Sequence, residues 1–165
     1  MNCKKCGKEI EPGSGFCPSC GTKQVARYSH SFIRKGMSEK EFIAQINAWF
    51  EENPRVANVS GKFTTRLGFG ILANTYKLKS LDIEYELFSS NNKNIYGVHK
   101  IKRFNVYKMN LEKLIEGWKN EVSGRSVVTW KGGTNSRGQA GSLLLGGIGA
   151  RNRMTAFVLY KQPAK

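Results

Sequence analysis

The sequence has few of the side chains that enzymes use for acid–base and nucleophilic chemistry. Only two histidines, His30 and His99, occur among its 165 residues, and 12 Asp and Glu stand against 27 Lys and Arg. General acid–base catalysis needs positioned pairs of titratable groups. The chain also has no nucleophile elbow and no P-loop pattern. We therefore predict a binding protein without enzymatic activity.

Long hydrophobic runs and a secretion signal are missing as well. No apolar stretch approaches the roughly 20 residues that a membrane-spanning helix requires, and the N-terminus lacks the apolar centre of a signal peptide. We expect a cytoplasmic protein, in a compartment where thiols stay reduced and available to a metal. Hydrophobic residues make up 39% of the chain and charged residues 24%, which is typical of a globular protein.

The scarcity of acids leaves a formal net charge of +15. Residues 25–165 hold the excess, with 23 Lys and Arg against 10 Asp and Glu, and no acid follows Glu121. Such a surplus favours polyanionic partners, namely a nucleic acid or an anionic membrane surface. A basic protein whose charge serves only its solubility is the alternative that the composition leaves open.

Four cysteines stand near the N-terminus as two C-x-x-C pairs separated by ten residues: Cys3, Cys6, Cys17 and Cys20. Two such pairs can close a tetrahedron of thiolates around one Zn²⁺. Gly7 and Gly21 follow the two pairs, where a tight turn favours a positive φ. Because four thiolates leave no open coordination position, the predicted zinc is structural. Two disulfides are the alternative, and they would need an oxidising compartment.

The segments 3–10 and 16–23 resemble the short zinc-ribbon family of bacterial and archaeal proteins. The resemblance covers residues 3–23 only. In that family the ribbon is an N-terminal accessory of many unrelated proteins, so the resemblance implies one structural zinc and a contact surface for protein or nucleic acid. We accordingly divide the chain into a zinc ribbon, 1–24, and a basic α+β domain, 25–165.

The larger domain shows strand and helix patterns in alternation. Ser38 and Glu41 form a predicted capping box before a helix that ends at Asn53. Asn110 caps a second predicted helix, which is expected to stop at Gly124. Strand patterns cover residues 27–35, 56–67, 81–87, 95–107, 126–130 and 154–160. The last of these is almost wholly apolar, which favours a buried central strand.

The order of these elements predicts a duplication. Residues 27–88 and 95–160 each run strand, helix, strand, glycine-rich apolar turn and strand, so a β-α-β-β unit would occur twice. We therefore expect an α+β fold with a mainly antiparallel sheet and both helices on one face.

Basic residues of the second half are the candidates for contacts with phosphate: Lys100, Lys102, Arg103, Arg137, Arg151 and Arg153. Sheet-based RNA readers combine such charges with exposed aromatic rings. No predicted helix has a basic face for the major groove, so RNA or a ribonucleoprotein is favoured over specific DNA. The alternative is that the lysines form the solvated edge of a sheet.

The glycine-rich segment 132–150 contains an apolar cluster: Leu143, Leu144, Leu145 and Ile148. A connection of this length in a small domain is usually functional or disordered. The cluster supports an alternative function, that of an adaptor docking on a protein or an anionic membrane surface with its charge only assisting. A mobile loop beside a hydrophobic hairpin is the remaining interpretation.

Overall fold

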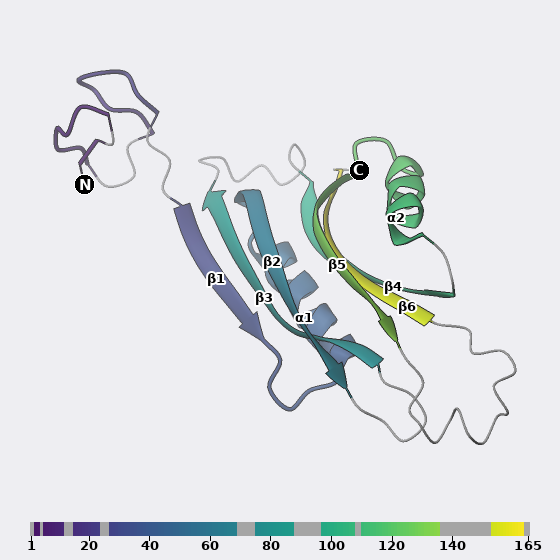
Figure 1. The fold of residues 1–165 in the computed structure, drawn as a ribbon. Helices are drawn as coiled ribbons and strands as arrows, with labels where there is room; N and C mark the ends of the chain where they lie inside the picture. Colours follow the sequence, from purple (N-terminus) through teal and green to yellow (C-terminus); the bar gives the residue numbers. More distant parts are fainter. Residues whose placement is uncertain are drawn as a thin grey trace, which may run out of the picture.

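The computed structural model describes residues 2–3, 5–11, 15–23, 27–68, 75–87, 97–107, 110–135 and 153–163. After the ribbon, the elements are β1 (Arg27–Ile33), α1 (Glu39–Glu52), β2 (Val56–Gly68), β3 (Thr75–Leu87), β4 (Val98–Tyr107), α2 (Leu111–Asn120), β5 (Ser126–Asn135) and β6 (Arg153–Gln162) (Figure 1). The succession β-α-β-β thus occurs twice, as the sequence predicted.

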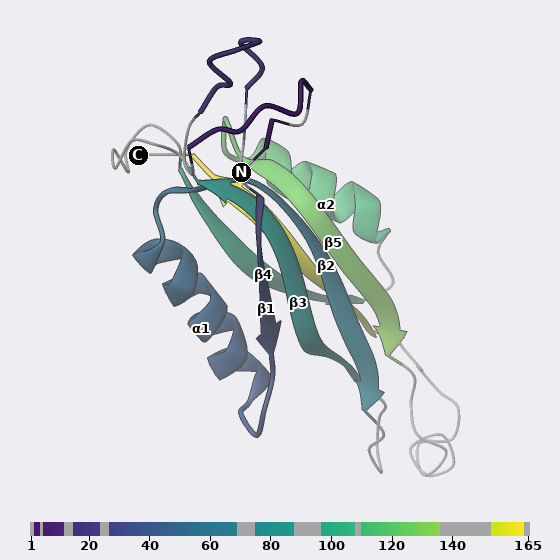
Figure 2. The same cartoon turned by 90° about the vertical axis from the view of Figure 1, so that its left-hand side faces the viewer.

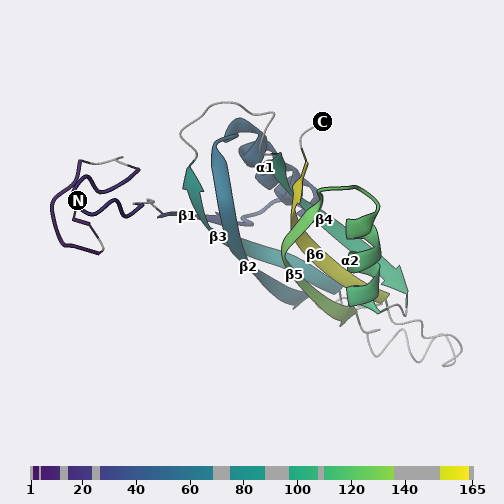
Figure 3. The same ribbon diagram turned by 90° about the horizontal axis from the view of Figure 1, so that it is seen from above.

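The strands form two antiparallel sheets of three strands each. The first sheet has the order β1-β3-β2, and the second has the order β4-β6-β5. In each unit the last strand is therefore central, between the first strand and the strand that follows the helix. The α+β class and the antiparallel pairing are confirmed. The expectation of a single sheet is corrected, because β2 and β5 lie side by side as edges of two separate sheets (Figure 3).

Helix α1 begins and ends where its caps predict. The Glu41 N–H donates to Ser38 Oγ at 3.2 Å, and the Ser38 N–H donates to Glu41 Oε2 at 2.8 Å. This reciprocal pair satisfies two backbone donors that the first turn leaves free. At the other end the Asn53 N–H donates to Trp49 O, which closes the last turn.

Helix α2 begins at its predicted cap but is shorter than the sequence indicated. The side chain of Asn110 accepts hydrogen bonds from the N–H groups of Glu112 and Lys113. The helix ends at Asn120, and Gly124, with a φ of +78°, belongs to the turn that follows it. Val122, which a helix running to Gly124 would contain, therefore lies beyond the helix and is exposed.

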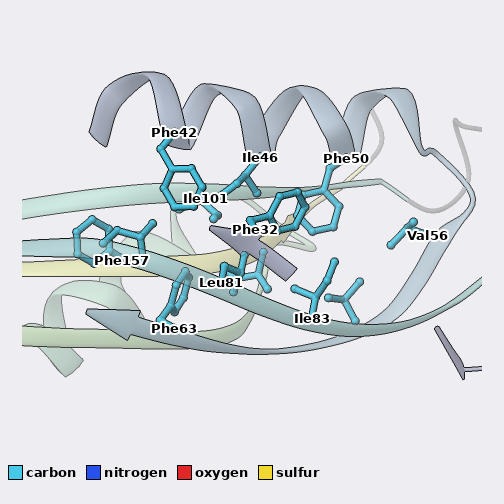
Figure 4. Packing of buried hydrophobic residues seen from close by; sticks show 13 residues of the cluster. Phe32, Phe42, Ile46, Phe50, Val56, Phe63, Leu81, Ile83, Ile101 and Phe157 are labelled. Atoms are coloured by element: carbon cyan, nitrogen blue, oxygen red, sulfur yellow. The ribbon is translucent and has the colours of Figure 1, made fainter. Parts of the chain in front are cut away.

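The main core lies between the two sheets and α1 (Figure 4). Phe42, Ile46 and Phe50 point from α1 toward the strands and are almost fully buried. They follow one another at the four-residue spacing that puts side chains on one face of a helix. The first sheet contributes Phe32, Val56, Val59, Phe63, Leu78, Leu81 and Ile83, and the second contributes Ile101, Phe157 and Leu159.

Strand β6 is buried on both of its faces, so the prediction of a buried central strand is confirmed. Its residues Thr155–Leu159 have no exposed surface. Phe157 and Leu159 belong to the main core, whereas Ala156 and Val158 pack beneath α2. The helices therefore lie on opposite sides of the second sheet and not on one common face, because the apolar run of β6 has to be covered twice.

The two units approach closely at Gly61 of β2. A Cβ at this position would lie 3.0 Å from Leu159 Cδ2, so a larger residue would require the Leu159 side chain to shift by a few tenths of an ångström. β2 has two register shifts against β3, one between Ala57 and Ser60, where Asn58 has a φ of +45°, and one between Thr64 and Thr65. Gly61 thus serves close packing, whereas Asn58 forms the first irregularity in the strand.

Helix α1 also covers the free edge of β4. The Ile101 N–H donates to Asn47 Oδ1 at 2.7 Å, and Asn47 Nδ2 donates to Ile101 O at 3.4 Å. The Asn47 side chain thereby occupies the place of a neighbouring strand. Such an edge otherwise presents unpaired N–H and C=O groups.

Candidate metal centre and basic surfaces

The four cysteine sulfurs form a compact cluster. The distance between the sulfurs of Cys3 and Cys20 is 3.6 Å, that between Cys6 and Cys17 is 3.6 Å, and all four sulfurs lie within 4.8 Å of one another. A tetrahedral Zn²⁺ with Zn–S bonds of about 2.3 Å holds its sulfurs about 3.8 Å apart. The cluster therefore fits one structural zinc ion, as the spacing of the cysteines predicted.

Two backbone turns with the same hydrogen bonds place the ligands. In the first turn the Cys3 N–H donates to Lys8 O at 2.8 Å, and the Gly7 N–H donates to Cys3 O at 2.9 Å. The second turn repeats both bonds at the same distances, from Cys17 and Gly21. Both glycines have a positive φ, +72° and +65°, which confirms the conformation expected of them.

Hydrogen bonds at two of the four sulfurs, those of Cys20 and Cys3, favour the thiolate form that a metal requires. Cys6 differs: although a backbone hydrogen bond from Lys8 lowers its pKa, burial and the neighbouring sulfurs raise it to about 12. The Thr22 side chain, with Oγ1 3.2 Å from Cys20 Sγ, and the Thr22 backbone lower the pKa of Cys20 to about 6. Backbone hydrogen bonds from Cys6 and then from Lys5, whose N lies 3.4 Å from Cys3 Sγ, lower the pKa of Cys3. The thiols of Cys3 and Cys20 therefore lose a proton more readily than an ordinary cysteine when a cation binds.

Two of the basic candidates on β4 are engaged within the protein. Lys100 Nζ lies 3.0 Å from Glu51 Oε1, and a guanidinium nitrogen of Arg103 lies 2.9 Å from Glu39 Oε1. Both carboxylates belong to α1, so these ion pairs flank the contact of Asn47 with β4. An anion would have to compete with them, although the nucleic-acid role of these residues stays a prediction.

Lys102, the third candidate on β4, lies against aromatic rings. Its Nζ is 5.1 Å from the centre of the Phe104 ring and 4.8 Å from a ring of Trp118, which is cation–π distance. The side chain is exposed at the mouth of an open hollow of about 460 Å³ between β4 and α2. Lys102 is thus the one of the three that forms no ion pair among the described residues, although Glu121 lines the same hollow.

The side chains of the remaining predicted site residues are not described by the structure. Arg137, Arg151, Leu143, Leu144, Leu145 and Ile148 lie outside the described residues. Arg153 is the first residue of β6, but its side chain is likewise outside the description.

A different basic surface lies where β2 ends and β3 begins. Arg66 and Lys77 are direct cross-strand partners, and Lys79 follows two residues later; all three side chains are exposed. We call these three residues the β2–β3 basic end. Like charges placed directly opposite one another destabilise a sheet. Within the described part of the chain, no ion pair relieves any of the three.

The sequence analysis did not single out this surface, because Arg66 is separated from the lysines along the chain. A signal was nevertheless present: Lys77 and Lys79 flank Leu78, which is fully buried. Alternation of this kind puts the charged residues of a strand in solvent. What no local pattern shows is that Arg66 would become the partner of Lys77.

The ribbon presents an aromatic ring that the sequence analysis also missed. Phe16 is 62% exposed and forms a β-bridge with Lys23, whose side chain is exposed as well. Phenylalanine is among the residues most often buried in a protein, so its exposure here is unusual. An exposed ring beside a cation is therefore a candidate contact for a base or for an apolar partner group.

Comparison with known proteins agrees with the metal centre. Residues 2–24 match the family model of the zinc-ribbon domain, so the N-terminal segment is a zinc ribbon. No curated protein and no solved structure matches the chain. Among the described residues, no helix is both long and apolar enough to cross a membrane.

Proposed function

We propose that this zinc-binding protein is a non-enzymatic nucleic-acid-binding protein, which contacts phosphates mainly through the β2–β3 basic end and prefers RNA to DNA. The observation that carries the proposal is the direct opposition of Arg66 and Lys77, with Lys79 nearby. The folded protein bears a repulsion here that an anionic ligand would turn into attraction.

The balance of charges over the whole chain supports a polyanionic partner. All twelve Asp and Glu lie among the described residues, and five of them form ion pairs with Lys or Arg: Glu39, Glu51, Glu86, Glu116 and Glu121. The charged residues outside the described ranges are all Lys or Arg. Intramolecular pairing therefore cannot neutralise the surplus, and phosphates could do so.

The charge of the helices supports RNA over specific DNA. Helix α1 has one lysine against four glutamates, and α2 has two lysines against two glutamates. Major-groove recognition normally places a helix inside the groove, between two rows of phosphates that repel acidic side chains. A contact made by strands and by exposed rings, such as Phe16 of the ribbon, suits single-stranded RNA better.

The absence of a catalytic step is part of the proposal. Among the described residues, the cysteines of the ribbon are the one grouping of three or more side chains able to hold a metal. Burial, and then the charge of Lys161, lower the pKa of His99 to about 4. This histidine is therefore neutral near pH 7 and a poor general acid or base there.

Binding of the purified, zinc-loaded protein to matched RNA and DNA oligonucleotides across a salt series tests the proposal. The test variant replaces Arg66, Lys77 and Lys79 with Gln. The control removes three lysines from the helices, at Lys40, Lys113 and Lys119, so that both variants lose the same charge.

We expect the plot of log K against log salt to be less steep for the test variant, with a slope smaller in magnitude by about 2, since each of three single-strand phosphate contacts contributes about 0.7. The control should leave the slope close to that of the wild type. Equal slopes in all three proteins would remove the β2–β3 basic end from the interface. Binding that disappears by about 0.15 M salt would show ordinary polycation behaviour and overturn the proposal.

A further inference from the structure

Strand β1 is an uncovered sheet edge. The two sheets have four edge strands, β1, β2, β4 and β5. β2 and β5 lie beside each other, and α1 covers β4 through Asn47 and Ile101. No described residue pairs with the outer side of β1, which runs along the border of the first sheet (Figure 2).

The backbone of β1 presents hydrogen-bonding groups on this side. The Arg34 N–H donates to Lys79 O at 3.0 Å, just beyond the paired residues of β1 and β3. Because hydrogen-bonded and non-hydrogen-bonded pairs alternate in an antiparallel ladder, Phe32 and His30 also direct their backbone groups toward β3. The N–H and C=O groups of Ser29, Ser31 and Ile33 then point away from the sheet.

β1 lacks the features that normally prevent pairing at an edge, which are charges, proline and bulges. Residues 28–33 contain no Lys, Arg, Asp, Glu or Pro, and the register with β3 has no shift. Tyr28 is 43% exposed and Ile33 is 52% exposed, so apolar groups lie at both ends of the strand. The small side chains of Ser29 and Ser31 between them leave room for another backbone.

A hollow of about 270 Å³ lies between β1 and α1. Phe32 and Phe42 provide apolar walls, while His30, Lys35 and Gln45 provide polar groups. A strand laid along β1 would direct every second side chain to this side of the sheet. Lys35 would make an acidic or polar side chain the better fit there.

We propose that the free edge of β1 binds an extended acidic segment of a partner protein by strand addition. Main-chain hydrogen bonds would provide affinity, and alternate side chains would provide specificity. Arg34 and Lys35 follow one end of β1, and neither of them forms an ion pair among the described residues. Arg27, at the other end, is paired with Glu86 at 3.7 Å, so the cations that an acidic segment would meet lie mainly beyond Ile33. A second copy of this chain is a poor occupant, because two proteins of net charge +15 repel each other. This inference is independent of the proposed nucleic-acid binding.

The test uses the full zinc-loaded protein and a synthetic peptide of alternating Glu and Val, about eight residues long to span β1. Its controls are a Lys-Val peptide and two forms of the Glu-Val peptide with N-methyl groups on alternate amides, one set in each register. Fluorescence anisotropy gives the affinity, and hydrogen exchange reports the amides of β1. We expect the Glu-Val peptide to bind and to slow exchange at Ser29, Ser31 and Ile33.

Ser31→Pro removes an outward N–H without removing a bond to β3, and edge strands tolerate proline at such positions. It should weaken peptide binding about tenfold. If the proline variant fails to fold, Ser31→Glu should weaken binding instead, because its charge repels the acidic peptide. Ser60→Glu adds the same charge at an exposed site of β2 and should bind the peptide like the wild type.

Several outcomes would overturn the inference. They are absence of binding, equal binding of the Lys-Val peptide, equal binding of both N-methylated forms, and unchanged affinity in both Ser31 variants. Concentration-dependent dimerisation that Ser31→Pro abolishes would assign the edge to a second copy of the chain instead.

Discussion

Replacing Asn47 with alanine should uncover the free edge of β4 and destabilise the α+β domain. In the native protein this side chain accepts the Ile101 N–H at 2.7 Å and donates to Ile101 O at 3.4 Å. Ile101 is only 4% exposed, so water cannot readily replace the lost partner. The Asn47→Ala protein would therefore contain a buried backbone donor with no acceptor.

The size of the effect follows from two opposing contributions. An unsatisfied buried N–H costs about 1–3 kcal/mol, and loss of the weaker, longer bond adds about 0.5 kcal/mol. Alanine favours the helix over asparagine by about 0.6 kcal/mol. The free energy of unfolding should accordingly fall by about 2 kcal/mol, which lowers the melting temperature by about 6 °C.

Urea unfolding followed by tryptophan fluorescence measures this change, because all three tryptophans lie in the α+β domain. Gln45→Ala is the matched control: it truncates a similar amide on the same helix, but at an exposed position. The control should be neutral within about 0.5 kcal/mol. Equal stability of the two variants, with unchanged hydrogen exchange at Ile101, would refute the role assigned to Asn47.

Three further predictions concern the metal centre, a buried histidine and the main core. Cys17→Ser should lose the bound zinc, as measured by metal analysis, while the tryptophan signal keeps its native transition, because the ribbon has a core of its own; full zinc occupancy would contradict the four-thiolate site. The pKa of His99 is about 4 in the folded protein, below the unfolded value of about 6.5. The neutral, buried histidine therefore contributes fully to stability above pH 6.5, and this contribution is lost as the pH falls toward 4. The loss between pH 8 and pH 5 is about 2 kcal/mol. His99→Gln should reduce the pH dependence of urea unfolding by that amount, and an unchanged dependence would show that His99 does not titrate in this way. Phe157→Ala should cost about 3–4 kcal/mol because Phe157 joins the two sheets in one core, whereas Phe16→Ala at an exposed site should cost less than about 0.5 kcal/mol; similar losses would refute this assignment of the core.

The features that sequence reasoning predicted well depend on neighbours in the chain. The zinc ligands and the helix caps at Ser38 and Asn110 are each set within a few residues, so their spacing alone identifies them. The apolar run of β6 showed that both its faces would be covered. It did not show which faces would meet α1 and α2, since that depends on how one β-α-β-β unit packs on the other.

For the basic residues too, the sequence identified the side chains but not their neighbours in the folded protein. Lys100 and Arg103 are plain in the sequence as charges, but their ion pairs with Glu51 and Glu39 arise only when α1 comes to lie along β4. In the same way, Arg66 meets Lys77 through the pairing of β2 with β3. Net charge is a property of the composition, whereas the charge that remains free for a ligand depends on tertiary pairing.

The sequence by itself therefore determined the zinc ribbon, the α+β class, the order of the repeated elements and the basic character of the protein. Only the tertiary structure decided that the strands divide into two sheets, that α1 covers one edge, and that β1 is left uncovered among the described residues. The physical reason is the distance along the chain over which each kind of interaction acts. Caps, turns and metal ligands act over a few residues, whereas sheet edges, ion pairs and hollows depend on segments that folding alone brings together.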